Sequence, residues 1–163
     1  MLRRGGIVLV ALAIAGSATA LPGLAKSKRK HTCKVDVTAL VATVKTNGGN
    51  PPDSGSNTSA GTLDGKICGK RFHGAVRGLV VFTGAGKFDV KNVTFGPRGS
   101  TTSKGSGAGT LNPDGSVGFS GTAKIVSGTG DTKGATGSYT FTGTQSTEDS
   151  RLSTQHVVGT LKY

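Results

Sequence analysis

Acidic residues are scarce in this sequence of 163 residues: eight Asp and Glu stand against twenty Lys and Arg, for a formal net charge of +12. Tryptophan is absent and only two Tyr and six Phe occur. Because no aromatic-rich recognition motif accompanies the basic charge, we expect no sequence-specific binding of nucleic acid. The surplus favours contact with an anionic envelope polymer or lipid surface, with solubility as the alternative explanation.

The sequence has no long apolar run after its N-terminal segment, and its composition is unfavourable for helices. The chain has 28 Gly, and a Gly inside a helix costs about 1 kcal/mol relative to Ala. The glycines do not follow the period of collagen. Short runs of Val, Ile, Leu and Phe separated by Gly, Asn, Ser and Pro are typical of strands and turns. The composition therefore predicts an all-β fold in one domain.

Groups that could support catalysis or bind a metal are few and dispersed. His31, His73 and His156 lie far apart in the sequence, so we expect no metal site. Gly128-Thr129-Gly130 lacks the further glycine of a dinucleotide fingerprint, since position 133 is Lys. We expect no cofactor, and no local motif identifies a catalytic residue.

The first 25 residues have the three parts of a signal peptide. Arg3 and Arg4 precede the apolar run 7–15, and Ala18-Thr19-Ala20 offers a cleavage site. The apolar run is too short for a membrane anchor, which needs about 20 residues. We expect residues 1–25 to be removed, with cleavage after Ala20 or Ala25, and the protein to be secreted into the extracellular space.

A basic arm and two cysteines follow the predicted leader. Residues 26–32 lack apolar periodicity and are predicted to form a flexible arm that binds polyanions through Lys26, Lys28, Arg29 and Lys30. Export would expose both cysteines to oxidising conditions, so a disulfide between Cys33 and Cys68 is favoured over two free thiols.

Residues 33–163 are predicted to form a single barrel domain of eight strands. The strands are expected at 33–46, 59–71, 73–84, 86–96, 101–111, 115–127, 134–144 and 154–163. Alternation is clearest near the C-terminus, where Phe119, Tyr139, Phe141 and Leu161 fall on predicted apolar faces. Short connections favour antiparallel neighbours, and closure removes the two bare edges of an open meander. The prediction is therefore an eight-stranded antiparallel up-and-down β-barrel.

Side-chain parity also suggests which polar residues face the interior. Asn92 shares its parity with Phe88 and Val90, and Asp64 shares its parity with Cys68, so both are candidate interior polar groups. The predicted disulfide conflicts with the side-chain parity of the first two strands. Pairing Cys33 with Cys68 across a simple hairpin joins odd to even positions, whereas the apolar residues of both strands are mainly odd. A one-residue bulge at Gly61, Gly65 or Gly69 would reconcile the two; otherwise either the disulfide or the register is wrong.

Two segments carry a resemblance to a known group of proteins. Residues 128–143 (GTGDTKGATGSYTFTG) resemble a motif of the allene-oxide-cyclase-like and dirigent-like barrels, and residues 159–163 are similar to the terminal strand of small secreted bacterial members. The sequence departs from the motif at Thr132, where an aromatic is usual. The resemblance implies an eight-stranded barrel, and an isomerase or cyclase that acts through polar residues inside it.

Two functions remain open at this point. One is a non-catalytic binding or structural module at the cell envelope or in the medium. The other is an isomerase or cyclase acting on a small apolar substrate inside the barrel, although narrow barrels are usually filled by their own side chains. The character of the barrel interior discriminates between them.

Overall fold

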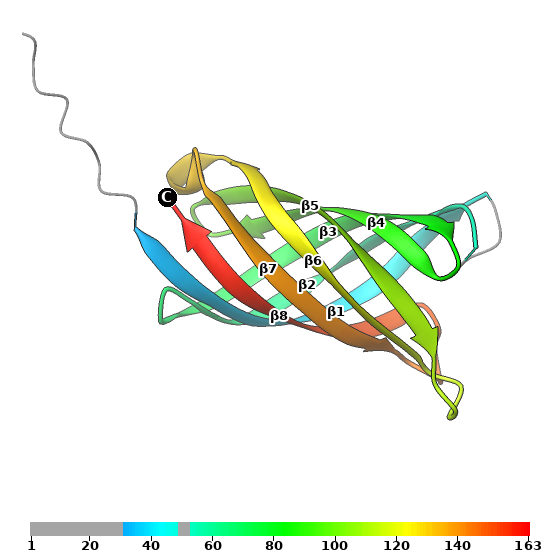
Figure 1. Cartoon of the computed structure of the whole chain (residues 1–163). Helices are drawn as coiled ribbons and strands as arrows, with labels where there is room; N and C mark the ends of the chain where they lie inside the picture. Colours follow the sequence, from blue (N-terminus) through cyan, green and yellow to red (C-terminus); the bar gives the residue numbers. More distant parts are fainter. Residues whose placement is uncertain (1–30, 49–52) are drawn as a thin grey trace, which may run out of the picture.

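The computed structural model describes residues 31–48 and 53–163, which form a closed antiparallel β-barrel (Figure 1). Its eight strands are β1 (Thr32–Asn47), β2 (Ser56–Ile67), β3 (Lys70–Gly84), β4 (Lys87–Gly96), β5 (Gly99–Leu111), β6 (Val117–Gly128), β7 (Thr136–Gln145) and β8 (Leu152–Lys162). Each strand pairs with its sequence neighbours, and β1 closes the barrel by pairing with β8. The predicted all-β class, strand count and closed barrel are confirmed.

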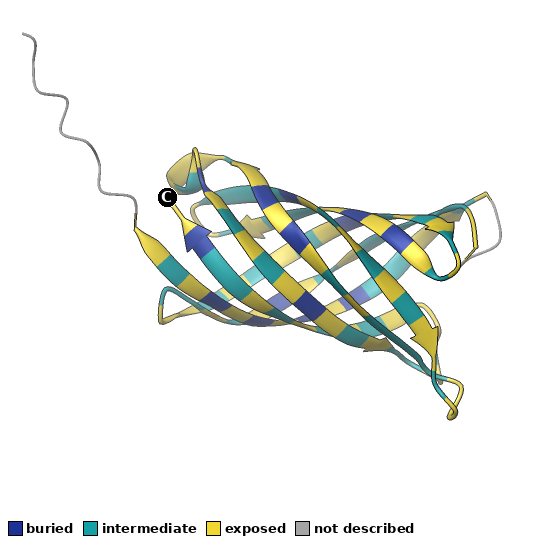
Figure 2. Ribbon diagram, in the orientation of Figure 1, coloured by how far each residue is buried: buried dark blue, intermediate teal, exposed yellow. Residues whose placement is uncertain are grey.

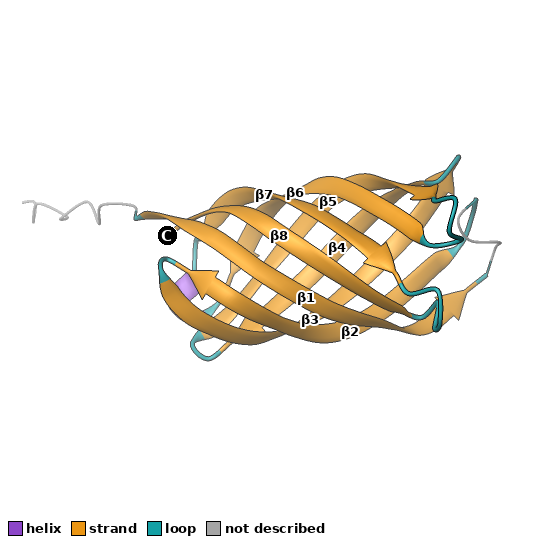
Figure 3. Cartoon of the chain, turned by 90° about the horizontal axis from the view of Figure 1, so that it is seen from below, coloured by secondary structure: helices purple, strands orange, loops and turns teal. Residues whose placement is uncertain are grey.

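The two ends of the barrel differ in what they carry. The β2–β3, β4–β5 and β6–β7 connections lie at one end, together with the start of β1 and the end of β8. We call it the disulfide end, and it is at the left in Figure 1. The other four connections lie at the opposite end. The 3-10 turn Gly130–Thr132 is the helical segment of the described residues and sits at the disulfide end (Figure 3).

Burial alternates along the strands, as Figure 2 shows. The alternation follows from the two-residue period of a strand, which sends successive side chains to opposite faces of the sheet. The predicted inward residues Phe141 and Leu161 are buried, and Phe119 and Tyr139 are partly buried against the same clusters. The buried apolar residues are Val35, Val37, Ala39, Val41, Leu63, Phe88, Val90, Ala123, Ile125, Ala135, Phe141 and Leu161.

Inward glycines accept aromatic rings from neighbouring strands. A Cβ added at Gly107 would lie 2.7 Å from the Phe88 ring, and one added at Gly143 would lie 2.6 Å from the Phe119 ring. Gly121 receives the ring of Phe141 in the same way. The rings therefore lie along the wall of the barrel, each in the space left by a glycine. Such contacts between an aromatic ring and a cross-strand glycine also stabilise strands that contain glycine.

The β2–β3 turn resolves the parity conflict between the cysteines. Cys68 and Gly69 both have positive φ, 55° and 74°, as in a two-residue type I′ hairpin turn. Cys68 is therefore in the turn and does not follow the alternation of β2, and Val35 pairs directly with Ile67. The expected bulge at Gly61, Gly65 or Gly69 is wrong, because the register shift in this hairpin lies between Thr43 and Lys45.

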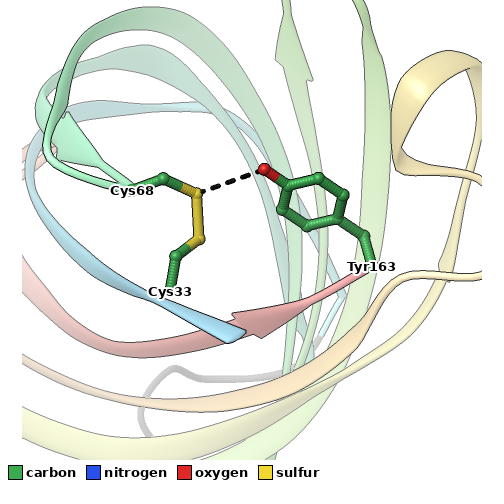
Figure 4. Close-up of a disulfide and its surroundings, with 3 residues drawn as sticks. All are labelled: Cys33, Cys68 and Tyr163. Carbon is green, nitrogen blue, oxygen red and sulfur yellow. Dashed lines mark hydrogen bonds between the residues drawn. A yellow bond between two sulfur atoms is a disulfide. The ribbon is translucent and has the colours of Figure 1, made fainter. Parts of the chain in front are cut away.

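A disulfide joins Cys33 of β1 to Cys68, as predicted. Tyr163, just after β8, points toward it (Figure 4), and its hydroxyl donates to Sγ of Cys68 at 3.6 Å. His31 and Tyr163 exchange two backbone hydrogen bonds, of 2.9 and 3.1 Å. The first strand thus begins at Thr32, one residue before the predicted boundary at Cys33.

The predicted leader (residues 1–25) and the basic residues Lys26, Lys28, Arg29 and Lys30 lie outside the described residues. Within the described part, none of the helices has the length and apolar character needed to cross a bilayer.

Candidate binding site in the barrel lumen

The barrel encloses a cavity of about 790 Å³, lined by residues from all eight strands. Ligand pockets for small organic molecules span roughly 300–1,000 Å³, so the cavity is large enough for one. Its lining reaches from Tyr163 and Arg98 at the disulfide end to Gly86 and Arg151 at the opposite end. The interior of this eight-stranded barrel is therefore hollow.

Two features of the sequence keep the lumen open. Glycines occupy inward positions on several strands, including Gly61, Gly78, Gly105 and Gly159, and the aromatic rings lie along the wall. Several inward apolar side chains consequently border the cavity and are only partly buried. They are Phe72, Val76, Val80, Phe82, Phe119, Tyr139 and Val157.

A row of neutral polar residues crosses this apolar lining. The register places Thr43 beside Ser59, Ser59 beside Gly78, Gly78 beside Asn92, and Asn92 beside Ser103 on consecutive strands. A Cβ at Gly78 would lie 2.6 Å from Oγ of Ser59 and 2.7 Å from Oδ1 of Asn92. Because Gly78 has no side chain, the Ser59 hydroxyl and the Asn92 amide oxygen can both occupy the space beside it on the inner wall.

Ser103 and Tyr139 extend the polar row past β6, from β5 to β7. Their hydroxyl oxygens are 2.6 Å apart, and Ser103 is the buried polar residue of the described core at 5% exposure. A buried hydroxyl needs such a partner, because an unpaired one loses its hydrogen bonds with water without replacement. The hydrogen bond holds the end of the Tyr139 side chain at Ser103, while its Cβ lies beside Gly159, where an added Cβ would be 2.5 Å from it.

We expect Ser103→Ala and Tyr139→Phe to show coupled effects on stability. Each variant removes one partner of a hydrogen bond with a net value of about 1 kcal/mol. In urea unfolding, the double variant should therefore cost less than the sum of the two single variants. Thr142→Val, at an exposed position on the outer face of β7, serves as the control. Strictly additive losses would show that the two hydroxyls do not interact.

Asn92 lies in the lumen lining as predicted, and Asn57 lies there too. Oδ1 of Asn57 is buried and has no hydrogen-bond partner among the described residues. An unsatisfied buried acceptor calls for an explanation, and here a donor on a molecule inside the cavity would satisfy it. Asn57 lies before the strand expected at 59–71, whereas β2 begins at Ser56 and includes it, so the sequence pattern did not mark it as a lining residue.

The expectation that Asp64 faces the interior is wrong. It was based on shared parity with Cys68, which fails because Cys68 occupies a turn with positive φ. Asp64 lies on the outer surface with 59% of its side chain exposed and pairs with His73 on β3. Asp36 pairs in the same way with His156 on β8, at 2.9 Å. These two pairs support contacts between neighbouring strands outside the lumen.

Charged side chains border the cavity at its two ends. Arg98 pairs with Asp131 at 3.4 Å at the disulfide end, where Lys70 and Arg71 also line the opening. Arg151 pairs with Asp149 at 2.8 Å at the opposite end. The hydrogen bonds and charge of Arg151 lower the pKa of the Asp149 carboxyl to about 2. The central part of the lumen is therefore lined by neutral groups between charged openings.

The described residues contain no group of three or more His, Cys, Asp or Glu side chains that could hold a metal ion. Glu148 and Asp149 lie in the β7–β8 connection, between the strands expected at 134–144 and 154–163. Comparison with known proteins found no match to a family model, to a curated protein or to a solved structure.

Proposed function

We propose that the protein is an exported, non-catalytic binding module that holds one small, largely apolar molecule in its lumen. The observation that carries the proposal is the cavity of about 790 Å³ with apolar walls and a row of neutral polar groups. Binding sites for small molecules combine these two features: apolar area supplies affinity, and a few polar groups fix orientation.

The polar row suggests the chemistry of the ligand. Ser59, Asn92 and Ser103 offer hydroxyl and amide groups, which donate and accept hydrogen bonds without charge. Their position between apolar surfaces suits a molecule with a hydrocarbon or aromatic body and one or two hydroxyl or carbonyl groups along its length. A fully charged group would lose hydration at this depth without an opposite charge beside it.

Export accounts for features of the chain outside the lumen. The leader at residues 1–25 directs secretion in this proposal, and oxidising surroundings favour the Cys33–Cys68 disulfide. Lys26, Lys28, Arg29 and Lys30 then precede the disulfide end in the sequence. We expect this segment to add affinity for polyanions that falls steeply with salt.

An isomerase or cyclase is the second candidate, and the Ser103–Tyr139 hydroxyl pair favours it. An apolar cavity with hydroxyls at fixed positions could orient a reactive substrate for ring closure. Among the described lining residues, the carboxylate is Asp131 at the rim, paired with Arg98. The polar groups deeper in the lumen are suited to orientation more than to proton transfer, which is why binding is the leading proposal.

The proposal can be tested by narrowing the lumen. Val80 pairs with Asn57 and Val90, and Val157 pairs with Val37 and Phe141. Neither has a direct cross-strand glycine neighbour over which a larger ring could lie. In Val80→Trp/Val157→Trp, the two indoles should therefore occupy the lumen.

The matched control uses the chain neighbours of the same two residues. Leu79 and Val158 face outward with 39% and 43% exposure, so Leu79→Trp/Val158→Trp adds the same two rings outside the barrel. In titrations with N-phenyl-1-naphthylamine, a fluorescent apolar probe, wild type and control should take up about one equivalent, and the lumen variant should lose at least tenfold in affinity. Circular dichroism and thermal melting establish that both variants fold. Equal uptake by the two folded variants would exclude the lumen as the binding site.

A further inference from the structure

The charges of this barrel are separated along its axis. Each end of the barrel comprises the connections there and the residues within two positions of a strand end. The disulfide end carries one acidic residue, Asp131, and seven basic residues: Lys34, Lys66, Lys70, Arg71, Arg98, Lys133 and Lys162. The opposite end carries three basic residues, Lys45, Lys87 and Arg151, and five acidic residues: Asp53, Asp89, Asp114, Glu148 and Asp149. One end is thus strongly cationic and the other weakly acidic.

The cations at the disulfide end are available to an external partner. All seven basic side chains there are exposed. Arg98 pairs with Asp131, and within the described part of the chain the other six form no ion pair. At the opposite end, Arg151 is paired with Asp149 and Asp114 binds the Ser116 hydroxyl. Uncompensated positive charge therefore gathers at one end of the molecule.

Exposed apolar side chains lie among these cations. Phe95, one residue from the end of β4, is 47% exposed, and Tyr163, just after β8, is 43% exposed. Val126, two residues from the end of β6, is 51% exposed. Aromatic and basic side chains together are typical of proteins that lie at the boundary between water and a bilayer. A soluble polyanion would use the cations alone.

We propose that the disulfide end is a docking surface for a bilayer that contains anionic phospholipids. The barrel meets the headgroups end-on, with Lys66, Lys70 and Arg71 near the phosphates. The acidic opposite end also exposes Val44 and Leu111, but its five carboxylates are repelled by the same lipids. Charge thus selects which end makes contact.

The lumen opens toward the docked surface. Lys70, Arg71 and Arg98 belong both to the cationic end and to the lining of the cavity. In this orientation a molecule dissolved in the bilayer would reach the lumen without crossing bulk water. This consequence rests on the proposed binding function, whereas docking itself does not.

The first experiment removes three charges from the disulfide end and, as a control, three charges from elsewhere on the barrel. Each Lys or Arg close to an anionic bilayer contributes roughly a fivefold factor to binding. Lys66→Gln/Lys70→Gln/Arg71→Gln should therefore lose roughly a hundredfold in partitioning onto phosphatidylglycerol–phosphatidylcholine vesicles at low salt. The control Lys45→Gln/Lys87→Gln/Lys104→Gln removes the same charge from the opposite end and the side wall, and it should change partitioning by less than about threefold.

The second experiment reports the orientation. The chain has no Trp, so Phe95→Trp and Leu111→Trp each place a single fluorophore at one end. Vesicles that contain brominated phosphatidylglycerol should quench the indole emission of the Phe95→Trp variant and leave that of the Leu111→Trp variant unquenched. Equal quenching of both would overturn end-on docking.

Three further results would contradict the proposal. One is that the Lys66, Lys70 and Arg71 variant binds vesicles like wild type while deletion of Lys26–Lys30 alone abolishes binding. Another is that heparin binds as tightly as vesicles without any quenching in Phe95→Trp, which would indicate a soluble polyanion as the partner. A third is equal binding to pure phosphatidylcholine. The lumen variant Val80→Trp/Val157→Trp should dock like wild type, so failure of docking and failure of lumen binding are separable.

Discussion

Replacement of both Cys33 and Cys68 by Ser should lower the free energy of unfolding by about 4 kcal/mol. The disulfide closes a span of 35 residues, and the cross-link restricts the unfolded chain more than the folded barrel. It also fixes the β2–β3 turn against β1, where the backbone N–H of Cys68 donates to the Lys34 carbonyl at 2.9 Å. Urea unfolding of the double variant and of wild type measures the difference.

Reduction of the wild type provides the matched control for this prediction. Wild type unfolded in the presence of dithiothreitol should match the Ser variant, because both lack the cross-link and keep small side chains at both positions. A loss below about 1 kcal/mol in both cases would mean that the barrel holds the two segments together without the bond.

The second large effect is expected at Phe141. Its side chain is 5% exposed, packs with Phe88 and Val90, and covers Gly121. Phe141→Ala should cost about 3–5 kcal/mol, since it removes a buried ring and leaves a gap in the wall. This is a large part of the roughly 5–15 kcal/mol that stabilises a typical domain.

Alanine substitutions of two other phenylalanines provide comparisons for Phe141→Ala. Phe119 is only partly buried because it borders the lumen, so Phe119→Ala should cost less than Phe141→Ala. Phe95 is 47% exposed on the outer face, so Phe95→Ala should change stability by no more than about 0.5 kcal/mol. Similar losses for Phe141→Ala and Phe95→Ala in urea unfolding would contradict the assignment of inner and outer faces.

The fold could be predicted because most strands alternate clearly. Phe119, Ala123 and Ile125 on β6, and Tyr139 and Phe141 on β7, share a parity that the structure places inside. Short connections and glycine-rich turns then left closure as the way to remove open edges. The turn at residues 112–115 was also predictable, and Gly115 adopts the positive φ, 83°, that its position requires.

The candidate site was harder to predict, for two physical reasons. On β5 both faces consist of Ser, Thr, Gly and Ala, apart from Lys104 and the terminal Leu111, so nothing in the pattern marked Ser103 as inward. Cys68 appeared to extend β2, which assigned Asp64 to the wrong face. The size of the lumen depends on how Phe88, Phe119 and Phe141 lie over glycines of neighbouring strands, and this depends on register rather than on local sequence.

The central claim is that the lumen holds a small molecule, and native mass spectrometry tests it most directly. The protein should be isolated from culture medium without detergent and measured intact, then again after extraction with organic solvent. We expect part of the protein to show an intact mass that exceeds the bare chain by the mass of one small molecule. This heavier species should disappear after solvent extraction, and it should not be found in Val80→Trp/Val157→Trp. A single bare mass in every sample, together with no uptake of N-phenyl-1-naphthylamine by the wild type, would contradict it.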